Sequence, residues 1–231
     1  MPLHSRTFDL DEQLEHLLAF VDKAPGPLAL VGHSIGATLA LRVLAARPSR
    51  IAAVVGLYPF LWNNAQSWLQ RAIAFAVRLR PLVWLVARLA ALLAALPSRL
   101  RRAALLPICR AAGLDDDAVA VSCDWLRPWS VLNTCELGRS EFDALAAPPD
   151  FATMRQHAAR IALYYGPKDD IWAPPHHYAE VRQKAPAMKV VTDAVCGHMF
   201  CVTSPGSQHV ARVTAGLLRD LGVPNLVTKA S

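Results

Sequence analysis

A serine stands where the surrounding sequence could make it a nucleophile. Ser34 is the centre of a Gly-X-Ser-X-Gly motif, with Gly32 before it and Gly36 after it. The apolar run 28–31 is typical of a strand and the run 37–44 of a helix, so the motif does not read as a chance match in a loop. In a sharp strand–turn–helix connection, small residues at 32 and 36 allow close approach and leave the serine exposed on a strained backbone. The amide of Ile35 would lie at a helix N-terminus, where it can stabilise an oxyanion.

A serine nucleophile needs a base within hydrogen-bond reach and an acid that orients this base. His198 follows the predicted strand 188–195, and Asp169 follows the predicted strand 160–166 by three residues, with a proline beyond. The order serine, acid, histidine, each at the carboxyl end of a strand, is the α/β-hydrolase arrangement. We therefore predict a triad of Ser34, Asp169 and His198, with Asp170 as the alternative acid.

The other histidines of the chain fit this site less well. His176 and His177 stand at the start of a predicted helix and are interpreted as surface residues. His33, inside the serine motif, is expected to pack beneath the site. Cys196 and His198 are close in sequence, but no further pair has the spacing of metal ligands, so we predict neither a metal nor a cofactor.

The remaining pattern alternates strands with helices. Apolar runs at 28–31, 51–58, 160–166 and 188–195 predict strands, and the periodicity predicts helices at 10–21, 175–184 and 207–221. Asp9 and Glu12 are typical of a helix N-terminal capping box. Such alternation predicts an α/β fold with a parallel sheet of about four strands and right-handed crossovers. We expect one domain over residues 1–231.

A long helical insertion, roughly residues 62–158, separates the second predicted strand from the third and would form a cap or lid. Segment 68–80 has an apolar face, Pro81 interrupts it, and segment 82–96 is nearly all apolar with Arg88 inside it. Fifteen residues do not span a bilayer. An interfacial helical hairpin fits better, with arginines at the headgroup level (Arg99, Arg101 and Arg102). The alternative is an ordinary cap packed on the core.

Charge and composition indicate which class of partner the chain binds and the redox state of its compartment. The chain has 231 residues, 54% of them hydrophobic, a mean hydropathy of +0.26 and a net charge of +6. No acidic residue occurs between Lys23 and Leu114, and the arginines there alternate with Leu, Ala, Val and Trp. This pattern favours a lipid interface, and no nucleic-acid-binding motif is present. Five cysteines without CxxC spacing and a polar, acidic N-terminal region without a secretory signal predict free thiols in a reducing compartment.

At these residues the chain resembles the lipid droplet-associated hydrolase family of serine hydrolases. The matching pieces are the segment 31–37 around Ser34, the segment 163–166 with Asp169 and 172–174 after it, and His198 with Phe200 behind it. The predicted helix 10–21 also looks like that of the family. The resemblance implies an α/β-hydrolase that cleaves lipid esters and resides on lipid droplets and the cytosolic face of the endoplasmic reticulum. It does not indicate a protein partner.

The segment before the serine motif departs from the family pattern. In this fold several strands and the second oxyanion donor precede the elbow, whereas this sequence offers one helix there. The strand 28–31 is therefore expected to be an exposed apolar edge, and the oxyanion hole to have only the Ile35 N–H unless the loop after Tyr58 completes it. Three functions remain open: a lipid esterase, a truncated and weakly active or inactive lipid-droplet-binding protein, and a lipid acyltransferase.

Overall fold

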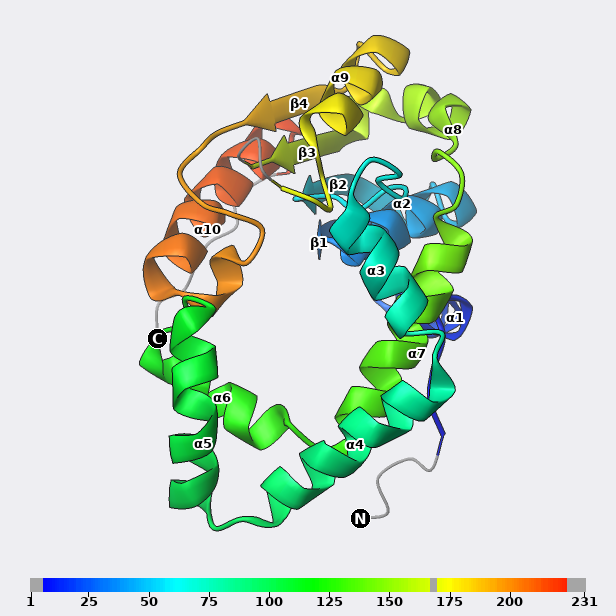
Figure 1. Cartoon of the computed structure of the whole chain (residues 1–231). Coiled ribbons are helices and arrows are strands. Elements are labelled where there is room, and N and C mark those ends of the chain that lie inside the picture. The colour runs from blue at the N-terminus through cyan, green and yellow to red at the C-terminus, as the bar shows by residue number, and fades with distance from the viewer. Residues whose placement is uncertain (1–5, 167–169, 224–231) are drawn as a thin grey trace.

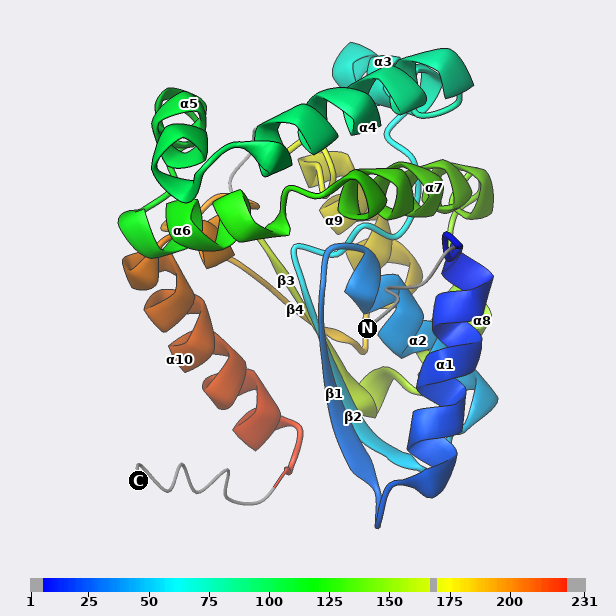
Figure 2. The same ribbon diagram turned by 90° about the horizontal axis from the view of Figure 1, so that it is seen from below.

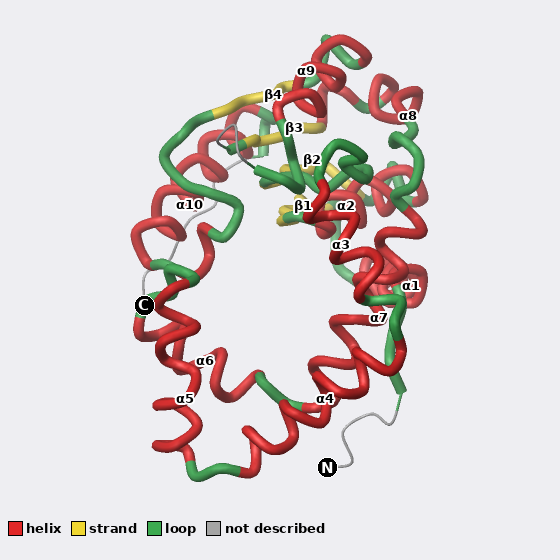
Figure 3. Tube along the Cα trace, viewed as in Figure 1, coloured by secondary structure: helices red, strands yellow, loops and turns green. Residues whose placement is uncertain are grey.

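The parallel sheet organises the molecule. The computed structural model describes residues 6–166 and 170–223, and within them the strands pair in the order β1-β2-β3-β4 (Figures 1 and 3). Their bounds are Leu28–His33, Ile51–Leu57, Ile161–Tyr165 and Lys189–Thr192, and every neighbouring pair is parallel. Parallel strands need crossover connections, which the helices between them provide. The predicted fold class is therefore confirmed.

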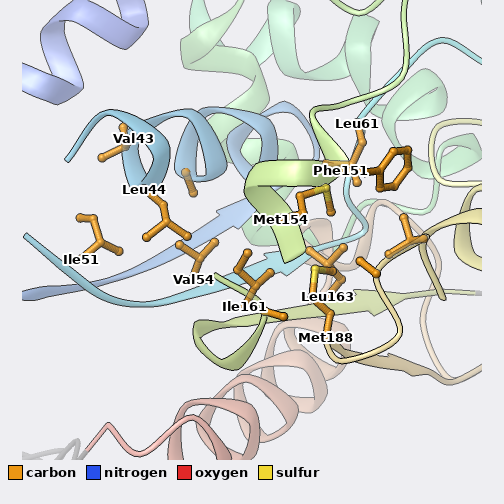
Figure 4. Close-up of a cluster of buried hydrophobic side chains, with 14 of the residues drawn as sticks. Val43, Leu44, Ile51, Val54, Leu61, Phe151, Met154, Ile161, Leu163 and Met188 are labelled. Atoms are coloured by element: carbon orange, nitrogen blue, oxygen red, sulfur yellow. The ribbon is translucent and has the colours of Figure 1, made fainter. Parts of the chain in front are cut away.

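Apolar side chains on both faces explain why β2 and β3 occupy the middle of the sheet. All residues of β3 are buried, and so are all residues of β2 except Ala52. One core packs against α2 (Ile35–Ala46), α8 (Phe151–Gln156) and α9 (Pro175–Lys184), as the labelled side chains in Figure 4 show for part of it. The second core lies against α10 (Ser204–Asp220) on the opposite side of the strands, visible in Figure 2. Helices thus cover both faces, as a parallel sheet requires.

The first helix, α1 (Leu10–Lys23), forms as its sequence predicts. The Asp9 side chain accepts a hydrogen bond from the Glu12 N–H at 2.9 Å, and the Glu12 side chain accepts one from the Asp9 N–H at 3.1 Å. This reciprocal pair is the expected capping box and satisfies two N–H groups at the helix start. Buried Leu10 and Val21 then lie on the helix face that packs inward.

The segment between β2 and β3 is helical, as predicted. It contains α3 (Trp68–Ala76), α4 (Arg80–Ala95), α5 (Ser98–Ala111), α6 (Asp116–Trp125), α7 (Pro128–Ala144) and α8. Pro81 lies in the first turn of α4, where its missing N–H costs no hydrogen bond, so it separates α3 from α4. Figure 1 shows α4, α5 and α6 extending away from the sheet and returning to α10. No helix in the described part of the chain is long and apolar enough to cross a membrane.

The far end of this helical segment is held at the start of α10. The Asp115 N–H donates to the carbonyl of Val202 at 3.1 Å, and the Asp115 carboxylate accepts from the Ser204 N–H at 2.8 Å. The same carboxylate caps α6 by accepting from the N–H of Ala118. One aspartate therefore joins the two helix N-termini.

The elbow strand β1 lies at an edge of the sheet. It pairs with β2 on one side, and no strand in the described residues pairs with its other side. Val31 is 49% exposed although it belongs to an apolar strand. The expectation of an exposed, apolar elbow strand is confirmed.

Candidate active site

The connection from β1 to α2 places Ser34 in a strained conformation. Its φ of 55° and ψ of −121° lie where residues with a Cβ are rare. Three backbone bonds hold it there: the Ser34 N–H donates to the carbonyl of Leu57 at 2.9 Å, and the Ser34 carbonyl accepts from the N–H of Ala37 at 3.1 Å and of Phe60 at 3.2 Å. Strain of this kind persists only where neighbouring structure imposes it, and it is common at nucleophiles.

The two glycines of the motif have different importance. A Cβ at Gly32 would lie 2.2 Å from the carbonyl oxygen of Gly36, so the turn forbids any side chain at position 32. A Cβ at Gly36 would meet no atom within 4 Å beyond its own helix and chain neighbours. The close approach of strand and helix therefore requires a glycine at position 32, whereas no contact outside its own helix requires one at position 36.

Three side chains from three strand ends form a continuous hydrogen-bonded chain. The Oγ of Ser34 lies 3.0 Å from Nε2 of His198, and Nδ1 of His198 lies 2.9 Å from Oδ2 of Asp170. Asp170 follows β3 and His198 follows β4, so both reach Ser34 from the carboxyl edge of the sheet. A carboxylate accepts only, so Nδ1 carries a hydrogen and Nε2 is left to accept the Ser34 proton.

The carboxylate beside His198 is the alternative of the two that the sequence offered. Asp169, the preferred one, lies outside the described residues, whereas Asp170 is buried, its side chain 1% exposed. The other carboxylate oxygen of Asp170 accepts the N–H groups of Trp172 at 2.8 Å and Ala173 at 3.1 Å. Neighbouring residues of a loop point in different directions, and sequence spacing does not reveal which of two adjacent aspartates faces inward.

The environment keeps Asp170 ionised. Burial alone would raise the pKa of its carboxyl, but the hydrogen bond to His198, its charge interaction with that ring and the two backbone N–H donors outweigh burial. The pKa of Asp170 is therefore lowered below its ordinary value. A buried carboxylate with several donors can hold an imidazole in one tautomer and orientation.

His33 supports the loop that carries His198. Its Nε2 lies 3.0 Å from the His198 carbonyl, and its ring contacts those of Tyr58, His198 and Phe200. Burial lowers the pKa of His33 to about 4, so the ring is neutral at pH 7 and donates its Nε2–H to that carbonyl. The expectation that His33 packs beneath the site agrees with these contacts. Its specific hydrogen bond has no signal in the sequence.

Tyr58 is a second supporting residue, and sequence reasoning missed it. It has a φ of 46°, is fully buried and donates its hydroxyl hydrogen to the Cys196 carbonyl at 2.8 Å, two residues before His198. A Cβ at Gly166 would lie 2.2 Å from the Tyr58 ring, so the glycine after β3 makes room for it. Burial raises the pKa of Tyr58 to about 12, which keeps the hydroxyl protonated as a donor.

The Ile35 amide is the first of α2, directly after Ser34. The first N–H groups of a helix have no acceptor within it, so this amide is available to an oxyanion. The loop after Tyr58 offers less than the sequence suggested: the Tyr58 N–H donates to Tyr164, the Phe60 N–H donates to Ser34, and Pro59 has no N–H. These three residues do not supply a second donor.

Two histidines of α9 differ from their predicted surface positions. His177 is completely buried and stacks on Trp62 with ring centroids 3.7 Å apart, whereas His176 is half-buried. The interpretation of His177 as a surface residue is wrong, because α9 packs this face onto the core. Burial lowers its pKa to about 3, so it is neutral at pH 7. The five cysteines are free, and the described residues contain no cluster of three or more potential metal ligands.

An apolar cavity lies behind the elbow helix. It has a volume of about 250 Å³ and is lined by α2, the α7–α8 connection and the start of β3, with Thr38 one helical turn from Ser34. None of the triad residues lines it. This cavity is therefore separate from the position where an ester would meet Ser34.

Comparison with solved structures shows the α/β-hydrolase fold. A carboxylesterase of the thaumarchaeon Nitrososphaera gargenis matches with a TM-score of 0.64 and 11% identity, covering 94% of this chain and 74% of that one. A thermophilic esterase from Thermogutta terrifontis matches with a TM-score of 0.57 and 14% identity over 95% and 75% of the two chains. A monoacylglycerol lipase from Paleococcus ferrophilus matches with a TM-score of 0.52 and 18% identity over 94% and 78%. At these identities the likeness is one of fold.

The sequence itself identifies the family. No curated protein matches the chain. The family model described as lipid-droplet associated hydrolase matches residues 2–201, most of the sequence, including Ser34, Asp170 and His198. The chain therefore belongs to the lipid-droplet associated hydrolase family.

Proposed function

We propose that this protein is a serine hydrolase that cleaves carboxylic esters of lipids at a lipid surface. The observation that carries the proposal is the hydrogen-bonded chain from Ser34 through His198 to Asp170, with 3.0 Å and 2.9 Å separations. Membership of a hydrolase family and the fold shared with esterases and a lipase support the same chemistry.

In the first half of the reaction Ser34 attacks the ester carbonyl. His198 takes the Oγ proton on Nε2, and Asp170 stabilises the imidazolium that forms. The carbonyl oxygen becomes an oxyanion, and the Ile35 N–H donates to it. His198 then gives the proton to the departing alcohol, which leaves an acyl group on Ser34.

In the second half a water molecule releases the acyl group. His198 accepts a proton from the water as it attacks the acyl-enzyme, and returns that proton to Ser34 when the carboxylic acid leaves. An alcohol in place of water would make the same site an acyltransferase. Exposure to water around Ser34, which is only partly buried, favours hydrolysis.

The helices after β2 supply a surface suited to lipid. Trp68 and Phe75 of α3 are 71% and 65% exposed, and Leu92 of α4 is 67% exposed. Further exposed apolar side chains continue along the segment (Leu69, Leu79, Leu82, Trp84, Leu85, Val86, Leu89, Leu96, Leu100 and Ile108). Singly exposed apolar residues are ordinary, but this many on the consecutive helices α3, α4 and α5 are typical of an interaction surface. We assign it to the lipid-droplet surface and the endoplasmic reticulum membrane, with residues 62–158 acting as a cap or lid.

The arginines that the sequence placed at the headgroup level differ in exposure. Arg99 is exposed, as is Arg88 in α4, and both can meet lipid headgroups; Arg102 is exposed but lies 3.9 Å from a carboxylate oxygen of Asp116. Arg101 is buried instead, and it bonds the carbonyl of Ala94 at 3.2 Å and the carboxylate of Asp124 at 3.3 Å. The expectation of a headgroup role is wrong for Arg101, because it ties α5 to α4 and α6.

A non-catalytic lipid-droplet-binding protein is the second candidate. The hydrogen bonds of the Tyr58 and Phe60 amides favour it, because both N–H groups already have acceptors within the protein. Ile35 is then the one oxyanion donor that we assign. Loss of one oxyanion-hole donor costs about 10²–10³ in rate, so a slow enzyme is also consistent with this geometry.

Activity and nucleophile are tested together. The full chain is incubated with a fluorophosphonate probe and with short-chain p-nitrophenyl esters, beside the Ser34→Ala variant. We expect the wild type alone to be labelled and to release nitrophenol. Equal labelling of both proteins, or equal turnover, would reject Ser34 as the nucleophile. Labelling and turnover absent from a folded wild type would favour the non-catalytic candidate.

A further inference from the structure

Two buried amides lie between the cap and the acid loop of the triad. Asn64 and Gln70 are 7% and 2% exposed, and Gln70 is in the first turn of α3. Both side-chain NH₂ groups, Asn64 Nδ2 and Gln70 Nε2, donate to the carbonyl of Ile171 at 3.3 Å. Ile171 is the residue directly after Asp170, so the two amides hold the backbone beside the acid.

The Gln70 side chain is itself held at its other end. Its Oε1 accepts the backbone N–H of Asn64 at 2.5 Å. The backbone N–H of Gln70 donates to the Ser67 hydroxyl at 3.1 Å. Both functional atoms of a buried amide are therefore satisfied, one by the segment before α3 and one by the acid loop. Buried polar groups that are fully paired fix a single arrangement, whereas a half-satisfied group is costly.

The acid loop is clamped from its other side by aromatic rings. Trp172 packs against Phe60 with centroids 5.2 Å apart and against Phe142 at 6.1 Å, and its ring lies 6.4 Å from that of His198. The loop backbone also folds around Asp170, whose carboxylate accepts two of its N–H groups. The start of α3 is hydrogen-bonded to this loop at the Ile171 carbonyl.

We propose that Gln70 is a positioning residue for the triad, because it joins the first helix of the cap to the Ile171 carbonyl and thereby holds Asp170 against His198. The proposal rests on the ester hydrolase proposed above. It goes beyond that function because it makes the triad geometry depend on the placement of α3. The outward residues of α3, Trp68 and Leu69, belong to the exposed apolar surface. The same helix, α3, would thus both contact the lipid surface and hold Asp170 in line with His198.

The test is a substitution that keeps volume and removes both side-chain bonds, Gln70→Met, in the full chain. A 1 Å misplacement can cost up to about 10²-fold in rate. Because Gln70 touches the acid loop and not the reacting atoms, we expect kcat to fall about tenfold, with KM changed less than twofold. Gln66→Met is the matched control, since Gln66 is exposed on the same segment. It should retain wild-type kcat. Unchanged kcat in Gln70→Met would overturn the proposal.

A double-mutant cycle separates positioning from general destabilisation. If Gln70 acts through Asp170, Gln70→Met should cost less than about twofold in an Asp170→Asn background, because the group that it positions is gone. An undiminished tenfold loss in that background would show a merely structural role and overturn the proposal.

A spectroscopic reading works even where turnover is absent. The hydrogen on Nδ1 of His198, bonded to Asp170, is expected as a downfield proton NMR resonance that Asp170→Asn removes. Gln70→Met should shift or broaden it, and Gln66→Met should not. An inactive wild type would reject the ester hydrolase, while an unmoved resonance in Gln70→Met would reject the positioning role, so the two failures are distinct.

Discussion

Replacing Asp170 by asparagine should disable the site with little change in its shape. Oδ1 of the new side chain can still accept the N–H groups of Trp172 and Ala173, which lie 2.8 Å and 3.1 Å away in the wild type. The NH₂ group, however, would replace Oδ2, the atom 2.9 Å from Nδ1 of His198. A donor there forces Nδ1 to accept, so Nε2 carries the hydrogen and can no longer take the proton of Ser34.

The size of the effect follows from this tautomer change. Loss of the correct tautomer in a serine–histidine–aspartate triad costs about 10⁴ in kcat. This equals about 5.4 kcal/mol of transition-state stabilisation at 1.36 kcal/mol per factor of ten. The assay is hydrolysis of a p-nitrophenyl ester and the rate of fluorophosphonate labelling, with thermal unfolding as the check on folding.

The adjacent aspartate provides the matched control. Asp169→Asn makes the same chemical change one residue away, and we expect it to keep most of the wild-type activity. Greater damage from Asp169→Asn than from Asp170→Asn would refute the assignment of the acid. A folded Asp170→Asn variant that keeps more than about a tenth of wild-type kcat would refute the tautomer argument itself.

Three further predictions concern lipid, pH and the sheet edge. Trp68→Ser should weaken binding to triolein emulsions about tenfold or more, since an aromatic side chain that leaves water contributes roughly 1.5–3 kcal/mol. Phe20→Ser, which changes another exposed aromatic residue on α1, should leave binding unchanged. An equal loss of binding in both variants would count against the α3 surface. The pKa of buried His177 is lowered from 6.5 to about 3, so the unfolded chain gains a proton first as pH falls below 6.5, and stability drops by about 1.4 kcal/mol per pH unit until pH approaches 3. His177→Phe should flatten the dependence of melting temperature on pH in that window, and an unchanged slope would show that other groups cause it. Val31→Lys on the edge strand should slow aggregation without abolishing activity, as measured by light scattering; faster aggregation would contradict an unpaired β1 edge.

Local pattern alone predicted the elements of this protein and the residue types of its candidate site. The run before Ser34 and the helix after it, the capping box at Asp9 and the strand before His198 depend on neighbours in sequence, which is why they were predictable. The parallel order of the strands followed from their alternation with helices. Type and order of the triad residues then followed from the strand ends.

Tertiary structure decided which atoms meet. Asp169 and Asp170 are equivalent to a pattern, and only the fold brings Asp170 to within 2.9 Å of His198. The supporting contacts of His33, Tyr58 and Gln70 join segments far apart in the chain, as in the Gln70 bond to Ile171 across 101 residues. Such contacts depend on the directions of side chains after packing, and sequence periodicity carries no information about them.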